Sequence, residues 1–159
     1  MAAKLSTGLR AALIGPQSLD AILAGGVIRC YSGQQPASAD APVQGTLLGS
    51  VTGGGLSFTP GSPLNGLQFV RANEYLMKRP DQSWVFKAVA AGTLGWFRLC
   101  GNAADAGGLS TSAIRLDGRI ALVDSSVDAQ MRTAVLQVVP GTEIPLPGFI
   151  FAFPPIASA

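Results

Sequence analysis

The chain has 159 residues, which suits a single domain long enough to bury about two-thirds of its unfolded surface. Hydrophobic residues make up 48% and charged residues only 13%, so a monomer would have to expose much apolar surface. A net charge of +2 with no basic run longer than Lys78-Arg79 excludes an electrostatic nucleic-acid surface. We therefore expect a homodimer, a homotrimer or a subunit docked on another protein. The alternative is a compact monomer with a surface rich in Ser, Thr and Gly.

Two short helices are predicted near the start of the chain. Ser6 can cap a helix over residues 7–14, because its side-chain oxygen can accept a hydrogen bond from an unpaired amide of the first turn. Ser18 can cap a second helix that ends at Gly25. Helices this short are marginal alone, so they must dock on the sheet or on a neighbouring subunit. We expect deletion of residues 1–25 to spare folding of the sheet and to weaken attachment to a partner.

Period-two alternation of hydrophobic residues, punctuated by Gly and Pro, predicts short strands along the rest of the chain. These strands cover residues 27–31, 46–51, 56–59, 84–89, 95–100, 113–116, 119–122, 134–139 and 149–153. The expected fold is mainly β, an antiparallel β-sandwich or jelly-roll-like domain with a short helical N-terminal segment. It comprises a helical N-terminal arm, residues 1–26, and the β-sandwich domain, residues 27–159, within one globular unit.

Two places in this pattern depend on local turn chemistry. Asp117-Gly118 predicts a two-residue hairpin turn between two of the strands, because such a turn needs positive φ at both positions. Residues 60–80 show the weakest pattern, with a strand predicted at 67–70 and a helical turn at 72–77. This segment is therefore the least defined part of the chain.

The residues needed for catalysis or metal binding are scarce. Without histidine, the chain lacks Ser-His-Asp and Cys-His catalysis and histidine-based metal sites. Most of its nine carboxylates lie in predicted turns, and residues 124–128 read as a solvated loop rather than a calcium site. Cys30 and Cys100 lack metal-ligand spacing, so buried free thiols are expected, with one disulfide between them left open. We expect no enzymatic activity, no catalytic residues, no metal and no cofactor.

Aromatic and basic residues within the predicted strands are the remaining candidates for binding. Trp96 and Phe97 point to opposite faces of a strand, which excludes one shared stacking surface. Arg29, Arg98 and Arg115 lie inside apolar strands. They either face solvent or form ion pairs with a neighbouring subunit.

Three segments carry a resemblance to a known family. They are Gly-Gly-Val-Ile-Arg-Cys-Tyr-Ser-Gly at 25–33, Ala-Gly-Thr-Leu-Gly-Trp-Phe-Arg at 91–98 and Ile-Arg-Leu-Asp-Gly at 114–118. With the shorter motifs at 35–40 and 45–49, the chain resembles small structural proteins encoded among the head genes of tailed phages and prophages. Residues 60–80 depart from this resemblance as a long insertion.

The resemblance implies a virion structural protein, most simply a capsid decoration or cement protein that stabilises the head lattice. Its expected partners are the major capsid protein and further copies of itself, without direct nucleic-acid or membrane contact. It would be made in the cytoplasm of the host bacterium and located on the capsid surface. The expected subunit or capsid contacts are Leu9, Arg10, Leu13, Arg29, Trp96, Arg98 and Arg115.

Two other functions stay open at this point. The first is a tail or head–tail connector component with the same kind of fold, which copy number per virion would separate from a capsid protein. The second is a glycan-binding virion surface module, with Trp84 or Trp96 as the sugar platform. An exposed indole face is the requirement of that second function.

Overall fold

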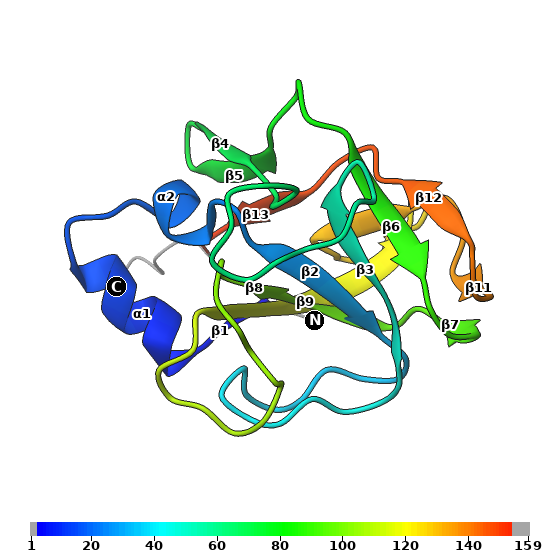
Figure 1. Ribbon diagram of the computed structural model, residues 1–159, viewed down its shortest axis with the longest axis horizontal. Coiled ribbons are helices and arrows are strands. Elements are labelled where there is room, and N and C mark those ends of the chain that lie inside the picture. The colour runs from blue at the N-terminus through cyan, green and yellow to red at the C-terminus, as the bar shows by residue number, and fades with distance from the viewer. Residues whose placement is uncertain (1–2, 154–159) are drawn as a thin grey trace.

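The computed structural model describes residues 3–153 and is mainly β, with 37% strand and 9% helix. The predicted mainly β, antiparallel class with a short helical segment is confirmed (Figure 1). In chain order the elements are β1 (Lys4–Leu5), α1 (Thr7–Ile14), α2 (Leu19–Leu23), β2 (Val27–Tyr31), β3 (Leu47–Gly53), β4 (Phe69–Ala72), β5 (Tyr75–Lys78), β6 (Trp84–Ala88), β7 (Gly92–Thr93), β8 (Trp96–Cys100), β9 (Arg115–Leu122), β10 (Met131–Thr133), β11 (Gln137–Val138), β12 (Glu143–Pro145) and β13 (Ile150–Ala152).

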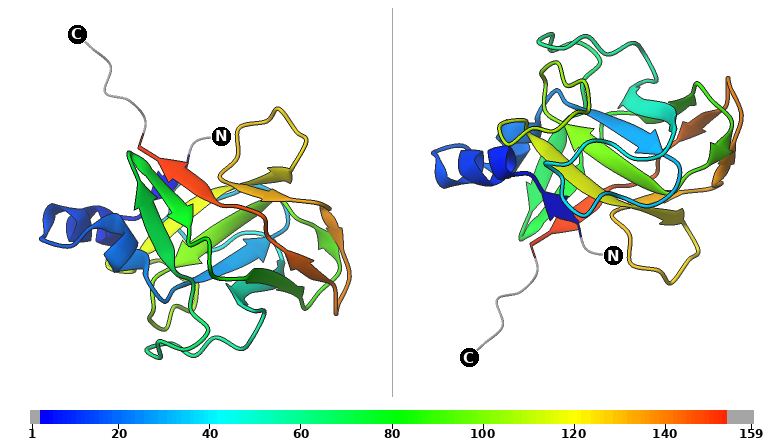
Figure 2. Two further views of the ribbon diagram at one scale, coloured as in Figure 1. Left: turned by 90° about the horizontal axis from the view of Figure 1, so that it is seen from above. Right: turned by 90° about the horizontal axis from the view of Figure 1, so that it is seen from below.

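The strands form one large sheet and two small ones. The large sheet runs β1-β9-β8-β2-β3-β6-β12, with every pair along this path antiparallel. β10 pairs in parallel with the second half of β9, while β1 pairs with its first half. A three-stranded sheet, β13-β5-β4, lies across one face of the large sheet (Figure 2, left), and β11 pairs with β7 as a separate ribbon. The domain therefore has two unequal layers.

One C-terminal segment connects these sheets. Between residues 131 and 152 the chain pairs in succession with β9, β7, β6 and β5. The hydrophobic pattern did not predict β10 and β12, because strands of three residues are too short for alternation to show. This segment links the two ends of the large sheet and then places β13 in the second layer.

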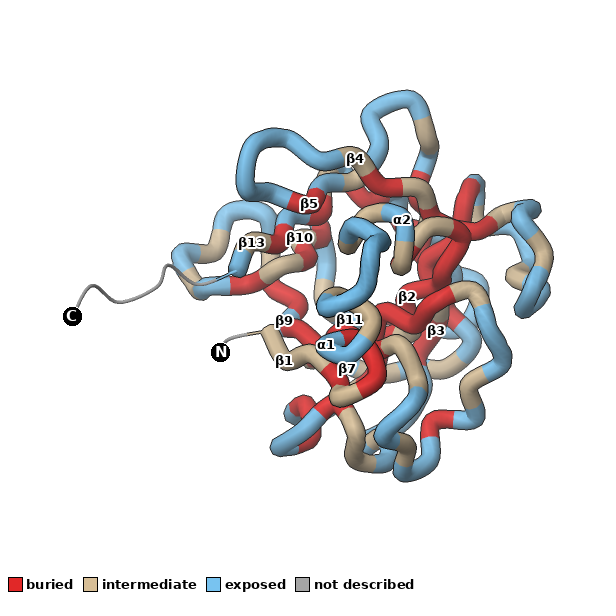
Figure 3. The backbone as a smooth tube through the Cα atoms, turned by 90° about the vertical axis from the view of Figure 1, so that its left-hand side faces the viewer, coloured by how far each residue is buried: buried red, intermediate tan, exposed pale blue. Residues whose placement is uncertain are grey.

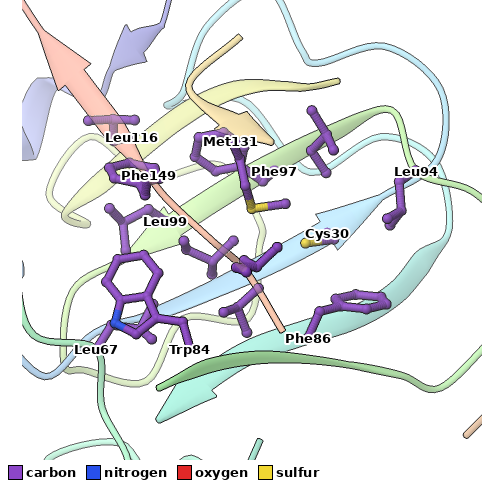
Figure 4. Close-up of a cluster of buried hydrophobic side chains, with 14 of the residues drawn as sticks. Cys30, Leu67, Trp84, Phe86, Leu94, Phe97, Leu99, Leu116, Met131 and Phe149 are labelled. Atoms are coloured by element: carbon purple, nitrogen blue, oxygen red, sulfur yellow. The ribbon is translucent and has the colours of Figure 1, made fainter. Parts of the chain in front are cut away.

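The hydrophobic core lies between the large sheet and the three-stranded sheet (Figure 4). Phe149, just before β13, contacts Trp84 from β6 and Phe97 from β8 with ring centroids 5.8 and 5.7 Å apart. Buried residues run along the central strands β2 and β9, while the loop tips are exposed (Figure 3). Cys30 belongs to this core, whereas Cys100 points to the opposite face of the sheet, so both are free, as expected.

The predicted hairpin at Asp117-Gly118 is wrong, because both residues lie within the continuous strand β9. Gly118 is directly opposite Phe97 on β8, and a Cβ there would lie 2.5 Å from the Phe97 ring. The missing side chain thus makes room for a core aromatic instead of permitting a turn. Tertiary packing overrides the local turn signal at this position.

Residues 60–80 contain a hairpin that the sequence pattern did not predict. β4 and β5 pair around a tight turn at Asn73, whose φ is 54°. The predicted helical turn at 72–77 is therefore wrong, and the expected strand at 56–59 is irregular backbone. The segment builds two of the three strands in the second layer.

The N-terminal helices are part of the same core. α1 has the predicted bounds, and Ser6 Oγ accepts a hydrogen bond from Leu9 N–H at 3.1 Å. Ser18 precedes α2 but makes no side-chain cap. Leu9 and Leu23 are completely buried within the core cluster. Neither described helix is long and apolar enough to cross a membrane.

Candidate functional site

A buried ion pair lies on the outer face of the large sheet, away from the hydrophobic core. Arg98 Nε and Nη2 donate to the two carboxylate oxygens of Asp117 at 2.7 and 2.8 Å. The side chains are 1% and 0% exposed. Residues 32–46 cross this face of the large sheet (Figure 2, right). Arg98 Nη1 also donates to the carbonyl of Ala41 in that loop, at 3.1 Å. The pair thus holds the loop against β8 and β9.

A second ion pair holds the loop of residues 101–114. Arg115 Nε and Nη2 each donate to a carboxylate oxygen of Asp105 at 2.7 Å. The same guanidinium donates to the carbonyls of Ala39, at 3.2 Å, and Gly108, at 2.8 Å. Bidentate charge-assisted bonds of this kind are among the stronger polar contacts in proteins. Arg115 therefore joins β9 to both loops.

Four of the seven expected contact residues are buried by this chain itself. Leu9 lies in the core, and Arg98 and Arg115 form intramolecular ion pairs instead of facing solvent or a neighbour. Trp96 is 1% exposed and stacks on Tyr31 with ring centroids 4.7 Å apart. The loops of residues 32–46 and 101–114 cover Trp96, Arg98 and Arg115, and the core covers Leu9, so none of the four offers the surface that was expected for a subunit contact.

The other three expected contacts keep some accessible surface. Arg10 is exposed, and Leu13 and Arg29 are partly buried. Trp84, like Trp96, is 1% exposed, so neither residue offers the indole face that a sugar platform needs. Of the three expected contacts that keep accessible surface, Arg29 is the one that lies on an open part of the large sheet.

The Asp105–Arg115 pair should make stability depend on pH. Burial alone would raise the pKa of Asp105, but hydrogen bonds from Arg115 and from Gly107 N–H outweigh it and hold the pKa below its usual range. Because the folded-state pKa lies below the unfolded value of about 3.9, this stabilisation is complete above that pH. It is lost as the pH falls through the folded-state pKa.

The measurement is urea unfolding of wild type and Asp105→Asn between neutral and strongly acidic pH. The difference in unfolding free energy between the two proteins should be largest near neutrality and shrink below about pH 4. A difference that stays constant across this range would contradict the assignment.

Polar and charged residues form a single row across the large sheet. Its members lie directly opposite one another on neighbouring strands: Lys4, Asp117, Arg98, Arg29, Ser50, Lys87 and Glu143. Residues directly opposite in an antiparallel pair share a face, so the row lies on the outer side of the sheet. The loops cover Asp117 and Arg98, while Arg29, Ser50 and Lys87 line an open groove.

This groove, which we call the row groove, lies over β2, β3 and β6 and has a volume of about 480 Å³. Arg29, Ser50 and Lys87 contribute its polar side chains from the three strands. Leu56 and Phe58 form part of its apolar wall, from the segment after β3. The arrangement suits an anionic group attached to an apolar neighbour.

The second open surface is the outer face of the three-stranded sheet, here called the apolar face. Its six side chains are Val70, Ala72, Tyr75, Met77, Ile150 and Ala152, in directly opposed rows of three. Ile150 is 44% exposed, Tyr75 39% and Met77 36%. A face without charged side chains, on which the Tyr75 hydroxyl is the one polar side-chain group, is typical of a surface that another protein covers.

Sequence analysis did not find the apolar face, although a signal for it exists. Two short apolar runs flank Asn73-Glu74, which is a hairpin pattern, and their alternate residues define the face.

Within residues 3–153, no group of three or more Asp, Glu, Cys or His side chains is placed to hold a metal ion. No protein-family model, curated protein or solved structure matches this chain.

Proposed function

We propose that this chain is a non-enzymatic structural protein that docks on a larger protein assembly through the apolar face. The observation that carries the proposal is that none of the six side chains of that face is charged, while four of the six residues, Ala72, Tyr75, Met77 and Ile150, are exposed. Apolar side chains in the centre of a patch are what protein interfaces bury. On the sequence resemblance, the assembly that we propose is the capsid of a tailed phage, where the chain would have a decoration or cement role.

Other features of the fold agree with a structural protein that must stay folded under mechanical load. The segment from 131 to 152 ties four other strands together, and buried ion pairs hold two long loops against the large sheet. With only 13% charged residues, the chain also relies little on long-range electrostatics for attachment. Attachment by apolar contacts is the mode that this composition favours.

Met77→Glu combined with Ile150→Glu tests the proposal. The two residues are directly opposite on β5 and β13, so the double variant places two carboxylates at the centre of the apolar face. Both positions are partly exposed, so folding should be preserved. We expect wild type to rebind capsids stripped of the protein and to raise their rupture temperature, and the double variant to do neither.

Leu109→Glu is the matched control, since Leu109 is 77% exposed and lies outside the apolar face. It should rebind as wild type does. Equal rebinding by all three proteins would exclude the apolar face as the docking surface, and failure of wild type to rebind would exclude the decoration role. Copy number per virion distinguishes a capsid protein from a tail or connector component.

A further inference from the structure

Arg29 is the central cation of the row, and within residues 3–153 it forms no ion pair. Its Nη1 donates to the main-chain oxygen of Asp105 at 2.5 Å, which is a neutral acceptor. The carboxylate of Asp105 is already bound by both arms of Arg115. Within the same described range, Nε and Nη2 of Arg29 have no hydrogen-bond partner. The half-buried guanidinium of Arg29 therefore has two donor atoms, Nε and Nη2, available for a ligand beside the row groove.

The neighbours of Arg29 in the row add positive charge instead of neutralising it. Arg98 lies directly opposite on β8, and like charges in that position destabilise a sheet. Asp117 offsets Arg98 but is fully engaged with it. On the other side, Ser50 separates Arg29 from Lys87, whose pair with Glu143 is exposed and therefore weak. The row groove therefore has, at its β2 edge, a guanidinium without an ion-pair partner among residues 3–153.

The wall of the row groove is apolar and held in place. Thr52 Oγ1 donates to the carbonyl of Leu56 at 2.6 Å, which ties the wall to β3. Leu56 is 59% exposed, and Val89, which also lines the groove, is 63% exposed. Apolar side chains beside an unpaired guanidinium define a site for a group that is anionic at one point and apolar around it.

We propose that the row groove binds a carboxylate side chain of an extended, acidic partner segment. Arg29 receives the carboxylate through Nε and Nη2, a planar fork that matches two carboxylate oxygens. Ser50 and Lys87 flank it, and an apolar neighbour in the segment packs on Leu56. A single unpaired guanidinium and a net charge of +2 fit one carboxylate better than a run of phosphates. This site lies on a different sheet from the apolar face and does not depend on the proposed function.

The test is a titration of the ¹⁵N-labelled full chain with a blocked peptide of alternating Leu and Glu, followed by amide chemical shifts. The parallel titrations use the matching Leu–Gln peptide and inorganic phosphate. We expect the Leu–Glu peptide to shift amides of Arg29, Ser50 and Lys87 and of residues 54–58, and the Leu–Gln peptide to leave them unchanged. The proposal is overturned if millimolar Leu–Glu peptide does not shift these amides. It is also overturned if the Leu–Gln peptide shifts them equally. Stronger binding of phosphate than of the Leu–Glu peptide overturns the acidic segment as the ligand.

Arg29→Gln should weaken binding of the Leu–Glu peptide at least tenfold. Arg119→Gln is the matched control, because Arg119 is an exposed strand arginine on the same face, opposite Trp96. It should bind as wild type does. Lys87→Gln, at an exposed position, gives a second variant whose folding is not at risk and should weaken binding severalfold.

Unfolding of the Arg29→Gln variant separates a binding role from a structural one. Removing a charge opposite Arg98 should leave the urea midpoint unchanged or higher, because the like-charge contact is relieved. A lower midpoint with unchanged peptide affinity would show that Arg29 serves only to hold the carbonyl of Asp105, and would overturn the proposal.

Discussion

Replacing Asp117 with asparagine should lower the free energy of unfolding by about 3–5 kcal/mol, because it leaves the guanidinium of Arg98 buried without its counter-charge. Asparagine has the same shape and keeps one oxygen acceptor, so the loss reports charge and not a cavity. The Asp117 and Arg98 side chains are 0% and 1% exposed, so water cannot solvate the orphaned cation. Urea unfolding at neutral pH measures the change.

Two comparison variants make this result specific. Asp81→Asn removes the carboxylate of the Arg79–Asp81 pair, whose side chains are 51% and 66% exposed, and should leave the free energy of unfolding nearly unchanged because water screens this pair. In the double variant Arg98→Met with Asp117→Leu, no charge is left buried, so much of the stability should return. A double variant as unstable as Asp117→Asn would show that the hydrogen bond to Ala41, not the ion pair, sets the stability of this region.

Deletion of residues 1–25 should leave the remaining chain unable to fold, in contrast to the expectation from sequence that the sheet would fold without them. The deletion removes Leu9 and Leu23, which are completely buried in the core cluster. It also removes β1 from the edge of β9. Expression of the truncated chain, followed by circular dichroism and proteolysis, measures the outcome. A soluble, cooperatively unfolding truncation would contradict this account.

A single substitution isolates the contribution of α1 to the core. Leu9→Ala should lower the free energy of unfolding by about 2–5 kcal/mol, since it leaves a cavity at a fully buried position. Ile14→Ala in the same helix is the control, because Ile14 is 88% exposed, and should change stability by less than about 0.5 kcal/mol. Equal effects of the two substitutions would show that α1 does not pack as described.

Sequence patterns predicted those helices and strands that depend only on residues close together in the chain. The bounds of α1 follow from Ser6 at its start and Gly15-Pro16 at its end. Strands β2, β6 and β8 follow from five-residue alternation. The same reasoning failed at Asp117-Gly118, because a turn pair is compatible with a strand when the glycine lies beneath a core aromatic.

The candidate sites depended on pairings that no local signal contains. Arg29, Arg98 and Arg115 are all arginines in apolar strands, and the sequence does not distinguish them. Their environments differ because Asp117 and Asp105 come from strand and loop positions 19 and 10 residues away from the arginines they bind. Only Arg29 has no such carboxylate among residues 3–153.

The sequence by itself determined a mainly β domain with two short helices and a low charge. These follow from periodicity, capping and composition, each of which acts over a few residues. The tertiary structure alone decided that α1 and α2 contribute to the core, that two loops cover the outer face of the sheet and that Arg29 has no ion-pair partner among residues 3–153. The physical reason is that burial and charge pairing are set by which strands become neighbours, and β9, β8 and β2 are neighbours in space but not in sequence.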